Sequence, residues 1–268
     1  MSHERLWSPR GGAGVCAVCF TFIDPRFERC LVCARTPNWL AATAPIAYSV
    51  HGGPLHRQIS GYKRDADPSV GDLELRLGAL LEGFLSAHER CLAGRASVER
   101  FEVAAVVPSC RGYGSQRHPL ARVIERHAPT VRERLRPLLE RGPGPLRPRR
   151  FDLGRFAAVE SLSGTNVLLI DDMWTTGASA QSAAAALRAA GAKSVAAIVI
   201  ARHLHSQRFA PAALLQARAR AFDAQVCALC APSKRRARER ATSAKPVAAL
   251  AGDDGSQLHY GACVGLRS

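Results

Sequence analysis

Apolar runs and amphipathic stretches alternate along the middle of the chain, from about residue 44 to residue 205. Short apolar runs predict buried strands at residues 46–50, 103–107, 167–170 and 195–200. Large apolar residues recur at helical spacing from Leu73 to Leu85, which predicts a long helix with Asp72 as its N-cap. Buried strands that alternate with helices are typical of a parallel sheet covered by helices, so the predicted fold class is α/β.

The clearest unit in this pattern is a strand, a turn, a helix and a second strand between residues 167 and 200. We expect a strand over Val167 to Ile170, a turn from Asp171 to Gly177 and a helix over Ala178 to Ala190, with Gly191 as its C-cap. With the following strand, these segments have the length of a βαβ element.

The ends of the chain lack this pattern. Residues 1–40 contain four cysteines and several Pro and Gly residues, and we expect a small metal-binding module there. Residues 41–230 would form the main domain, and residues 231–268 would form a basic tail without stable structure. The Pro- and Gly-rich residues 141–148 predict a surface loop or flap, because neither a helix nor a central strand tolerates this composition.

Composition restricts the class of protein. The chain has 268 residues, enough for one large or two smaller domains, and no apolar run of about 18 residues that could span a bilayer. The first residues lack the apolar stretch of a secretory signal, so we expect a cytoplasmic protein with reduced cysteines and no membrane partner.

The net charge of +15 comes from arginine, since only four of the 37 basic residues are lysines. Between Arg111 and Arg155 there are twelve arginines and four acidic residues. Such a stretch attracts polyanions or phosphorylated substrates, but a genome that favours arginine codons would produce the same excess.

The cysteines near the N-terminus have the spacing of a metal site. Two Cys-x-x-Cys pairs, Cys16 with Cys19 and Cys30 with Cys33, predict a structural Zn²⁺ site, with an iron–sulfur cluster as the second choice. The module could bind nucleic acid or support the main domain, and support is favoured because the loop between the pairs carries only two arginines.

The remaining cysteines and two histidines are less informative. A third pair, Cys227 with Cys230, has no evident partner, and a redox dithiol, half of a metal site or a packing pair all stay open. Cys91, Cys110 and Cys263 are expected to act as small apolar residues. We interpret His203 and His205 as loop residues.

The turn after residue 170 carries the candidate chemistry. Asp171 and Asp172 follow a buried strand, at the edge where open α/β sheets bind their ligands. The following loop enters a helix, whose N-terminus provides N–H groups and a partial positive charge for a phosphate monoester; its residues are Thr175, Thr176, Gly177, Ala178 and Ser179. Two carboxylates would repel a phosphate, so they must face sugar hydroxyls or a cation, and the arrangement indicates ribose 5-phosphate.

Residues 167–179 resemble the phosphoribosyl-diphosphate (PRPP) motif of type I phosphoribosyltransferases. A cysteine module followed by such a domain resembles the ComF family of amidophosphoribosyltransferase-like proteins, over roughly residues 12–205. The resemblance implies a type I phosphoribosyltransferase-like parallel sheet flanked by helices, with a small zinc-ribbon-like module before it.

The resemblance also implies roles for these residues. Asp171 and Asp172 would be the catalytic pair that binds the ribose 2- and 3-hydroxyls, and the loop Thr175–Ser179 would hold the 5-phosphate. Arg111 and Gly112 would belong to the diphosphate loop, and Mg²⁺ would bind with PRPP. The implied reaction displaces diphosphate from C1, as in nucleotide metabolism. Purine salvage relatives have an aspartate at the position of Thr175, so a purine acceptor is less expected.

The main alternative is a non-catalytic ComF-like protein that binds single-stranded DNA during DNA uptake. Aromatic residues make up only 6% of the chain, which leaves few platforms on which bases could stack. Rossmann and P-loop motifs are missing where those folds require them. A homodimer stays open, and Lys63 is interpreted as an exposed surface lysine rather than a phosphate ligand.

Overall fold

The structure, a computed structural model, describes residues 6–64, 69–109, 118–144, 147, 149–204 and 221–230. Its helices are α1 (Leu31–Arg35), α2 (Pro54–Gly61), α3 (Val70–Arg95), α4 (Pro119–His127), α5 (Pro129–Arg132) and α6 (Ala178–Ala189). Its strands are β1 (Ala42–Val50), β2 (Val103–Val106), β3 (Leu139–Arg141), β4 (Phe156–Ala158), β5 (Asn166–Trp174) and β6 (Ser194–Leu204). The tail predicted at 231–268 lies outside the described residues.

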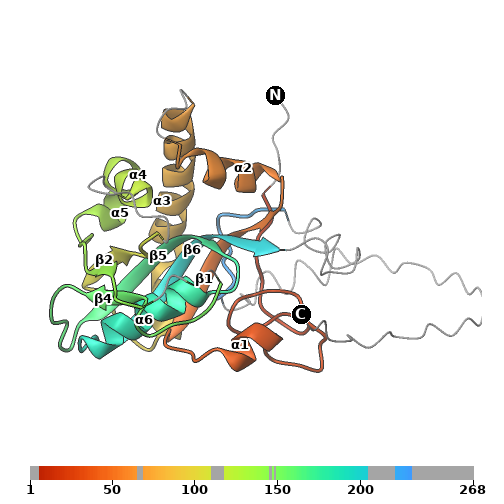
Figure 1. The fold of residues 1–268 in the computed structure, drawn as a ribbon. Coiled ribbons are helices and arrows are strands. Elements are labelled where there is room, and N and C mark those ends of the chain that lie inside the picture. The colour runs from red at the N-terminus through yellow and green to blue at the C-terminus, as the bar shows by residue number, and fades with distance from the viewer. Residues whose placement is uncertain are drawn as a thin grey trace, which may run out of the picture. The chain divides into compact units, whose positions relative to one another are not determined.

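The core of the fold is a four-stranded sheet in the order β1-β6-β5-β2 (Figure 1). All three strand pairs are parallel, so the carboxyl ends of the four strands lie at one edge. The α/β prediction is therefore confirmed. Within the part of the chain that the structure describes, no helix is long and apolar enough to cross a bilayer.

Alternate residues of the central strands pack on opposite faces of the sheet. On β5, Leu168 and Ile170 belong to the core beneath α2 to α5, whereas Val167 and Leu169 belong to the core beneath α6. Figure 1 shows α6 on one side of the sheet and the longer α3 on the other. Because both faces are covered, both sets of strand residues are apolar, which is why the sequence shows continuous apolar runs.

The long helix α3 begins earlier than the sequence pattern indicated. Ser69 is its N-cap and Asp72 lies in the first turn, so the predicted Asp72 N-cap is wrong. A carboxylate in the first turn still stabilises the helix through its dipole. Glu74 is 1% exposed and accepts hydrogen bonds from Arg122 (2.6 Å) and Arg126 (2.9 Å) of α4. This ion pair holds α3 and α4 together.

The predicted βαβ element is present as β5, α6 and β6. Alanine supplies most of the buried residues of α6, and small side chains let this helix lie close to the sheet. The helix ends at Ala189 with Ala190 as its C-cap, one residue before the predicted C-cap Gly191, which has the left-handed φ of 96° that often follows a helix end.

The cysteine-containing module packs against the α6 side of the sheet. Cys16, Cys19 and Cys33 belong to the same core as the buried alanines of α6. Gln181 of α6 accepts a hydrogen bond from the Trp39 backbone (2.7 Å) and donates one to Asn38 (2.9 Å). These contacts agree with a supporting role for the module.

The described part of the Pro- and Gly-rich segment, residues 141–144 and 147, begins in β3 and continues toward β4 of a small hairpin. Strands β3 and β4 pair antiparallel, and the Gly144 N–H donates to the Gly154 carbonyl (2.7 Å). The Asp152 N–H donates to the Ser182 hydroxyl of α6 (3.0 Å), so this hairpin connection contacts the first turns of α6.

Candidate functional site

The acidic pair lies inside β5 rather than in a turn after it. Asp171 pairs with Val199 of β6, and the ladder continues to Trp174 opposite Arg202. The predicted turn at Asp171 is therefore wrong, because pairing with the long strand β6 keeps the backbone extended. The acids still lie at the carboxyl end of the sheet, where ligands of open α/β folds bind.

Asp172 is 6% exposed and contacts the segment that follows α2. Its Oδ2 accepts a hydrogen bond from the Tyr62 hydroxyl (2.5 Å) and lies 2.5 Å from the Lys63 ammonium. Asp172 continues the strand face of Leu168 and Ile170, the face covered by α2 and α3, which explains this contact. Lys63 is thus one-third exposed and ion-paired with Asp172, whereas an exposed surface lysine was predicted.

Burial and mutual repulsion shift the titration of the site. Burial, followed by the charge of Asp172, raises the pKa of Asp171 from 3.8 to about 7, although Lys63 opposes the shift. Burial lowers the pKa of His118 to about 4, with the Lys63 charge adding to the effect and Asp172 opposing it. His118 is the N-cap of α4, and its Nδ1 accepts the Leu120 N–H (3.2 Å). A neutral imidazole therefore stands near the acidic pair at neutral pH.

The loop after β5 turns sharply into α6. Gly177, the N-cap residue, has a φ of 81°. A Cβ at this position would lie 2.1 Å from the Trp174 ring, so both the backbone angle and the neighbouring indole require glycine. The Thr176 hydroxyl accepts the Ala178 N–H (3.3 Å) and contacts the Arg149 carbonyl (3.3 Å). The loop from Thr175 to Ser179 thus leads from the end of β5 into the first turn of α6.

The structure does not describe every predicted site residue. The proposed diphosphate-loop residues Arg111 and Gly112 lie outside the described residues, as do Cys110 and His205. His203 is 5% exposed and belongs to β6, with its Nδ1 3.4 Å from the Ser49 hydroxyl, so its interpretation as a loop residue is wrong.

Four cysteines converge as their spacing predicts. The sulfurs of Cys16, Cys19, Cys30 and Cys33 all lie within 4.8 Å of one another, and the Sγ atoms of Cys19 and Cys30 are 3.7 Å apart. Thiolates in this arrangement suit a tetrahedral metal such as zinc.

A buried arginine connects this cysteine group to the loop after β5. The Arg202 side chain donates to the Cys19 carbonyl through Nε (2.7 Å) and to the carbonyls of Trp174 (3.1 Å) and Thr175 (3.2 Å) through Nη1. Its Nη2 lies 3.5 Å from the Cys19 sulfur. Sequence alone does not indicate this role of Arg202, nor that of His118, because both depend on contacts between distant segments.

Comparison with known proteins agrees with this arrangement. None of the curated proteins searched matches the chain. The family model of the phosphoribosyl transferase domain matches residues 123–212, a segment of 90 of the 268 residues that contains β5, α6 and β6. The part of the chain that carries the acidic pair and the loop Thr175–Ser179 therefore resembles a phosphoribosyl transferase domain.

Proposed function

We propose that the protein is a phosphoribosyltransferase that binds PRPP with Mg²⁺ and transfers ribose 5-phosphate to an acceptor, releasing diphosphate. The observation that carries this proposal is the junction of β5 and α6. There, two neighbouring carboxyl groups stand beside a glycine-dependent helix N-terminus, inside the segment that matches the phosphoribosyl transferase domain.

The acidic pair would bind the ribose. Asp171 and Asp172 are adjacent at the carboxyl end of β5, and at this edge of the sheet each carboxylate would accept a hydrogen bond from one of two neighbouring hydroxyls of the sugar. The Tyr62 hydroxyl and the Lys63 ammonium fix the Asp172 carboxylate, which limits its rotation before the sugar binds. Such prior orientation reduces the entropy lost on binding.

The loop from Thr175 to Ser179 would hold the 5-phosphate. The first four N–H groups of a helix lack partners within the helix, and the helix dipole favours an anion at this end. The left-handed Gly177 brings the loop backbone to the start of α6, where side-chain hydroxyls of threonine and serine add further donors.

The diphosphate would lie beside the neighbouring strand. Strand β2 pairs with β5, with Val106 opposite Ile170, so the segment after β2 starts next to the acidic pair. Arg111 and Gly112 belong to that segment, and an arginine side chain there would match diphosphate oxygens. Lys63, already at Asp172, would add a positive charge as the C1–oxygen bond breaks and the acceptor lone pair forms the new bond. When bound, Mg²⁺ would neutralise charge on the leaving diphosphate.

Titration calorimetry with PRPP and Mg²⁺ tests the proposal. We expect the wild-type chain to bind PRPP, and the double variant Asp171→Asn with Asp172→Asn to lose this binding while its circular dichroism spectrum stays unchanged. The control is Asp72→Asn, which alters an exposed carboxylate on α3 and should leave PRPP affinity unchanged. Equal affinities of the double variant and the wild type would refute the proposal.

A further inference from the structure

A second group of metal-binding side chains lies on the other face of the sheet from the four-cysteine group. It consists of His88 and Cys91 of α3 together with Cys227 and Cys230 of the segment 221–230. We propose that these four residues bind a second zinc ion, which attaches the segment 221–230 to α3. The proposal does not depend on PRPP binding.

The distances between the ligand atoms fit a tetrahedral site. The Sγ of Cys230 lies 3.4 Å from that of Cys227, 3.8 Å from that of Cys91 and 3.5 Å from Nδ1 of His88. Cys91 Sγ and His88 Nδ1 are 3.9 Å apart. Zinc bound to sulfur at about 2.3 Å and to nitrogen at about 2.0 Å places neighbouring ligands roughly 3.5 to 3.8 Å apart. The three cysteines are free, because a disulfide would need sulfurs about 2.05 Å apart.

The ligand pairs come from segments whose local geometry already orients them. His88 and Cys91 are three residues apart on α3, so they lie on the same helix face. Cys227 and Cys230 form a Cys-x-x-Cys turn closed by a hydrogen bond from the Cys230 N–H to the Cys227 carbonyl (3.3 Å). The Leu229 N–H donates to the Cys227 sulfur (3.3 Å), a contact that stabilises a thiolate.

The hydrogen bonding of His88 fixes the tautomer that a metal requires. His88 is 4% exposed, and its Nε2 lies 2.8 Å from the Ala224 carbonyl. A carbonyl only accepts hydrogen bonds, so Nε2 carries the proton and Nδ1 presents its lone pair to the sulfurs. Histidine ligands of metals usually donate their other ring N–H to a backbone carbonyl or carboxylate in this way.

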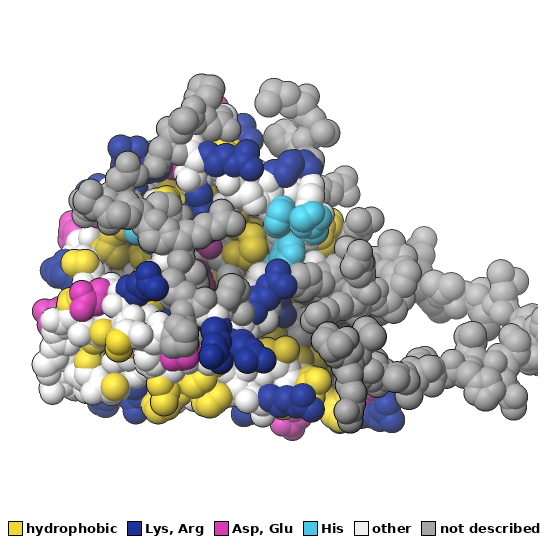
Figure 2. Space-filling view, viewed as in Figure 1, with side chains coloured by type: hydrophobic (Ala, Val, Ile, Leu, Met, Phe, Trp, Pro, Cys, Tyr) yellow, Lys and Arg dark blue, Asp and Glu magenta, His cyan; other side chains and the backbone are white. Residues whose placement is uncertain are grey.

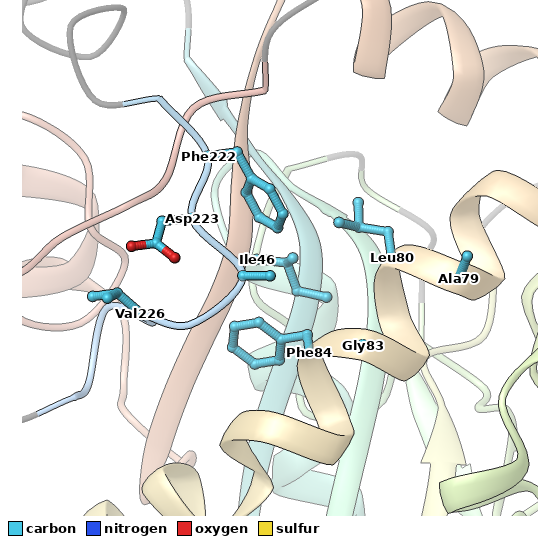
Figure 3. A pocket seen from close by; sticks show the side chains of 9 residues that line it. Ile46, Ala79, Leu80, Gly83, Phe84, Phe222, Asp223 and Val226 are labelled. Carbon is cyan, nitrogen blue, oxygen red and sulfur yellow. The ribbon is translucent and has the colours of Figure 1, made fainter.

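The apolar packing of the segment against α3 leaves a cavity, so a metal ion would add to the attachment of the segment to α3. Figure 3 shows Phe222 of the segment and Phe84 of α3 on either side of Ile46 of β1 in this view. A cavity of about 80 Å³ remains between them, lined also by Leu80 and Val226. A zinc ion bound by two residues from each side would join α3 to the segment directly.

The ligand set favours zinc over other ions. Three thiolates and one imidazole, with no carboxylate or carbonyl ligand, suit a soft or borderline metal. Cys₃His is a common ligand set of structural zinc. Cys91, which we predicted to be a small apolar residue, would therefore be a metal ligand. Together with His88 it would complete the site for which Cys227 and Cys230 supply the other half.

Metal analysis of the full chain tests the proposal. We expect two zinc ions per wild-type chain and one in the double variant Cys227→Ser with Cys230→Ser. The control Cys263→Ser replaces a cysteine outside both groups and should retain two. One zinc per wild-type chain, equal zinc contents of the wild type and the double variant, or iron in place of the second zinc would each overturn the proposal.

X-ray absorption at the zinc edge of the wild-type chain provides a test that requires no variant to fold. With both groups occupied, the average zinc would have 3.5 sulfur and 0.5 nitrogen ligands. A shell of four sulfurs without nitrogen would contradict the second site. Hydrogen exchange then locates the effect: loss of the second ion should speed exchange in residues 221–230 and leave residues 166–189 unchanged.

Discussion

The carboxyl group of Asp171, which we propose binds ribose, lowers the stability of the folded chain at neutral pH. It is enclosed by the sheet edge and faces the charge of Asp172, and these effects raise its pKa to about 7. The unfolded chain would release this proton near pH 3.8, so between pH 4 and pH 7 the folded state holds it more tightly. Stability therefore falls as the pH rises through this range, and the full cost is present above pH 7.

Replacing this carboxyl group by an amide should remove the cost. We expect Asp171→Asn to raise the unfolding free energy by about 1 to 3 kcal/mol at pH 8 and by much less at pH 4, where the folded carboxyl group is protonated and the unfolded one is only partly ionised. The amide oxygen can still accept the Asp172 N–H, which is bonded to Asp171 at 2.9 Å. Thermal unfolding of the variant and the wild type from pH 4 to pH 8 measures the difference.

The exposed Asp72→Asn variant serves as the control for this series, because its difference from the wild type should not follow the same pH dependence. An Asp171→Asn advantage that grows toward low pH would contradict the raised pKa.

At the scale of elements, the cysteine module and the loop after β5 share one buried side chain. A zinc ion with four thiolates carries a net negative charge, and the Arg202 guanidinium beside Cys19 offsets part of it. The same guanidinium bonds the backbone of Trp174 and Thr175, at the start of the proposed phosphate loop. Loss of metal should therefore disturb the loop through this arginine.

Arg202→Met tests this connection. The variant would leave buried carbonyls of Cys19, Trp174 and Thr175 without their donor, at about 1 to 3 kcal/mol for each group left unsatisfied. We expect a lower melting temperature, faster zinc release to a coloured chelator and weaker PRPP binding. Arg76→Met, at an exposed position of α3, should change none of the three. A variant that melts earlier but binds PRPP as tightly as the wild type would show that Arg202 supports the fold alone.

The elements that the sequence predicts well are those whose cause is local. The apolar run at 167–170, the alanine-rich helix and Gly191 identify β5, α6 and the end of α6 because strand burial, helix propensity and the left-handed cap each depend on neighbouring residues. The convergence of the four N-terminal cysteines could also be predicted, from the spacing of the two Cys-x-x-Cys pairs. The extension of β5 through Asp171 could not be predicted, because it depends on pairing with the long strand β6.

Contacts between distant segments explain the other differences. The approach of Lys63 to Asp172 requires the order of the strands, which a single sequence does not contain. The partner of the Cys227–Cys230 pair lies on α3, more than 130 residues earlier in the chain. Sequence spacing and composition therefore could not predict that these residues contact one another.

At the scale of the whole molecule, part of the arginine excess is used inside the fold. Arg122 and Arg126 pair with the buried Glu74, and Arg134 forms a two-pronged ion pair with Glu89. Arg155 is 1% exposed and donates to backbone carbonyls. Arg136 also donates to the Glu133 and Leu135 carbonyls, so at least five of the arginines that the structure describes between residues 118 and 155 have structural partners. Figure 2 shows the described basic side chains of the visible face in several separate groups.

This distribution leads to a prediction about single-stranded DNA. We expect nonspecific electrostatic binding, so the affinity for single-stranded DNA should fall steeply between about 50 and 200 mM salt. The slope of log K against log salt should be about −0.7 for each phosphate neutralised. Fluorescence anisotropy with a labelled oligonucleotide measures the slope. The double variant Asp171→Asn with Asp172→Asn should give the same slope as the wild type, since uncharged amides at the sugar site remove no cation. If the chain still binds the oligonucleotide at 200 mM salt and PRPP displaces it, the chain would instead be a DNA-binding protein that uses the proposed sugar-phosphate site. Simple charge attraction explains neither observation.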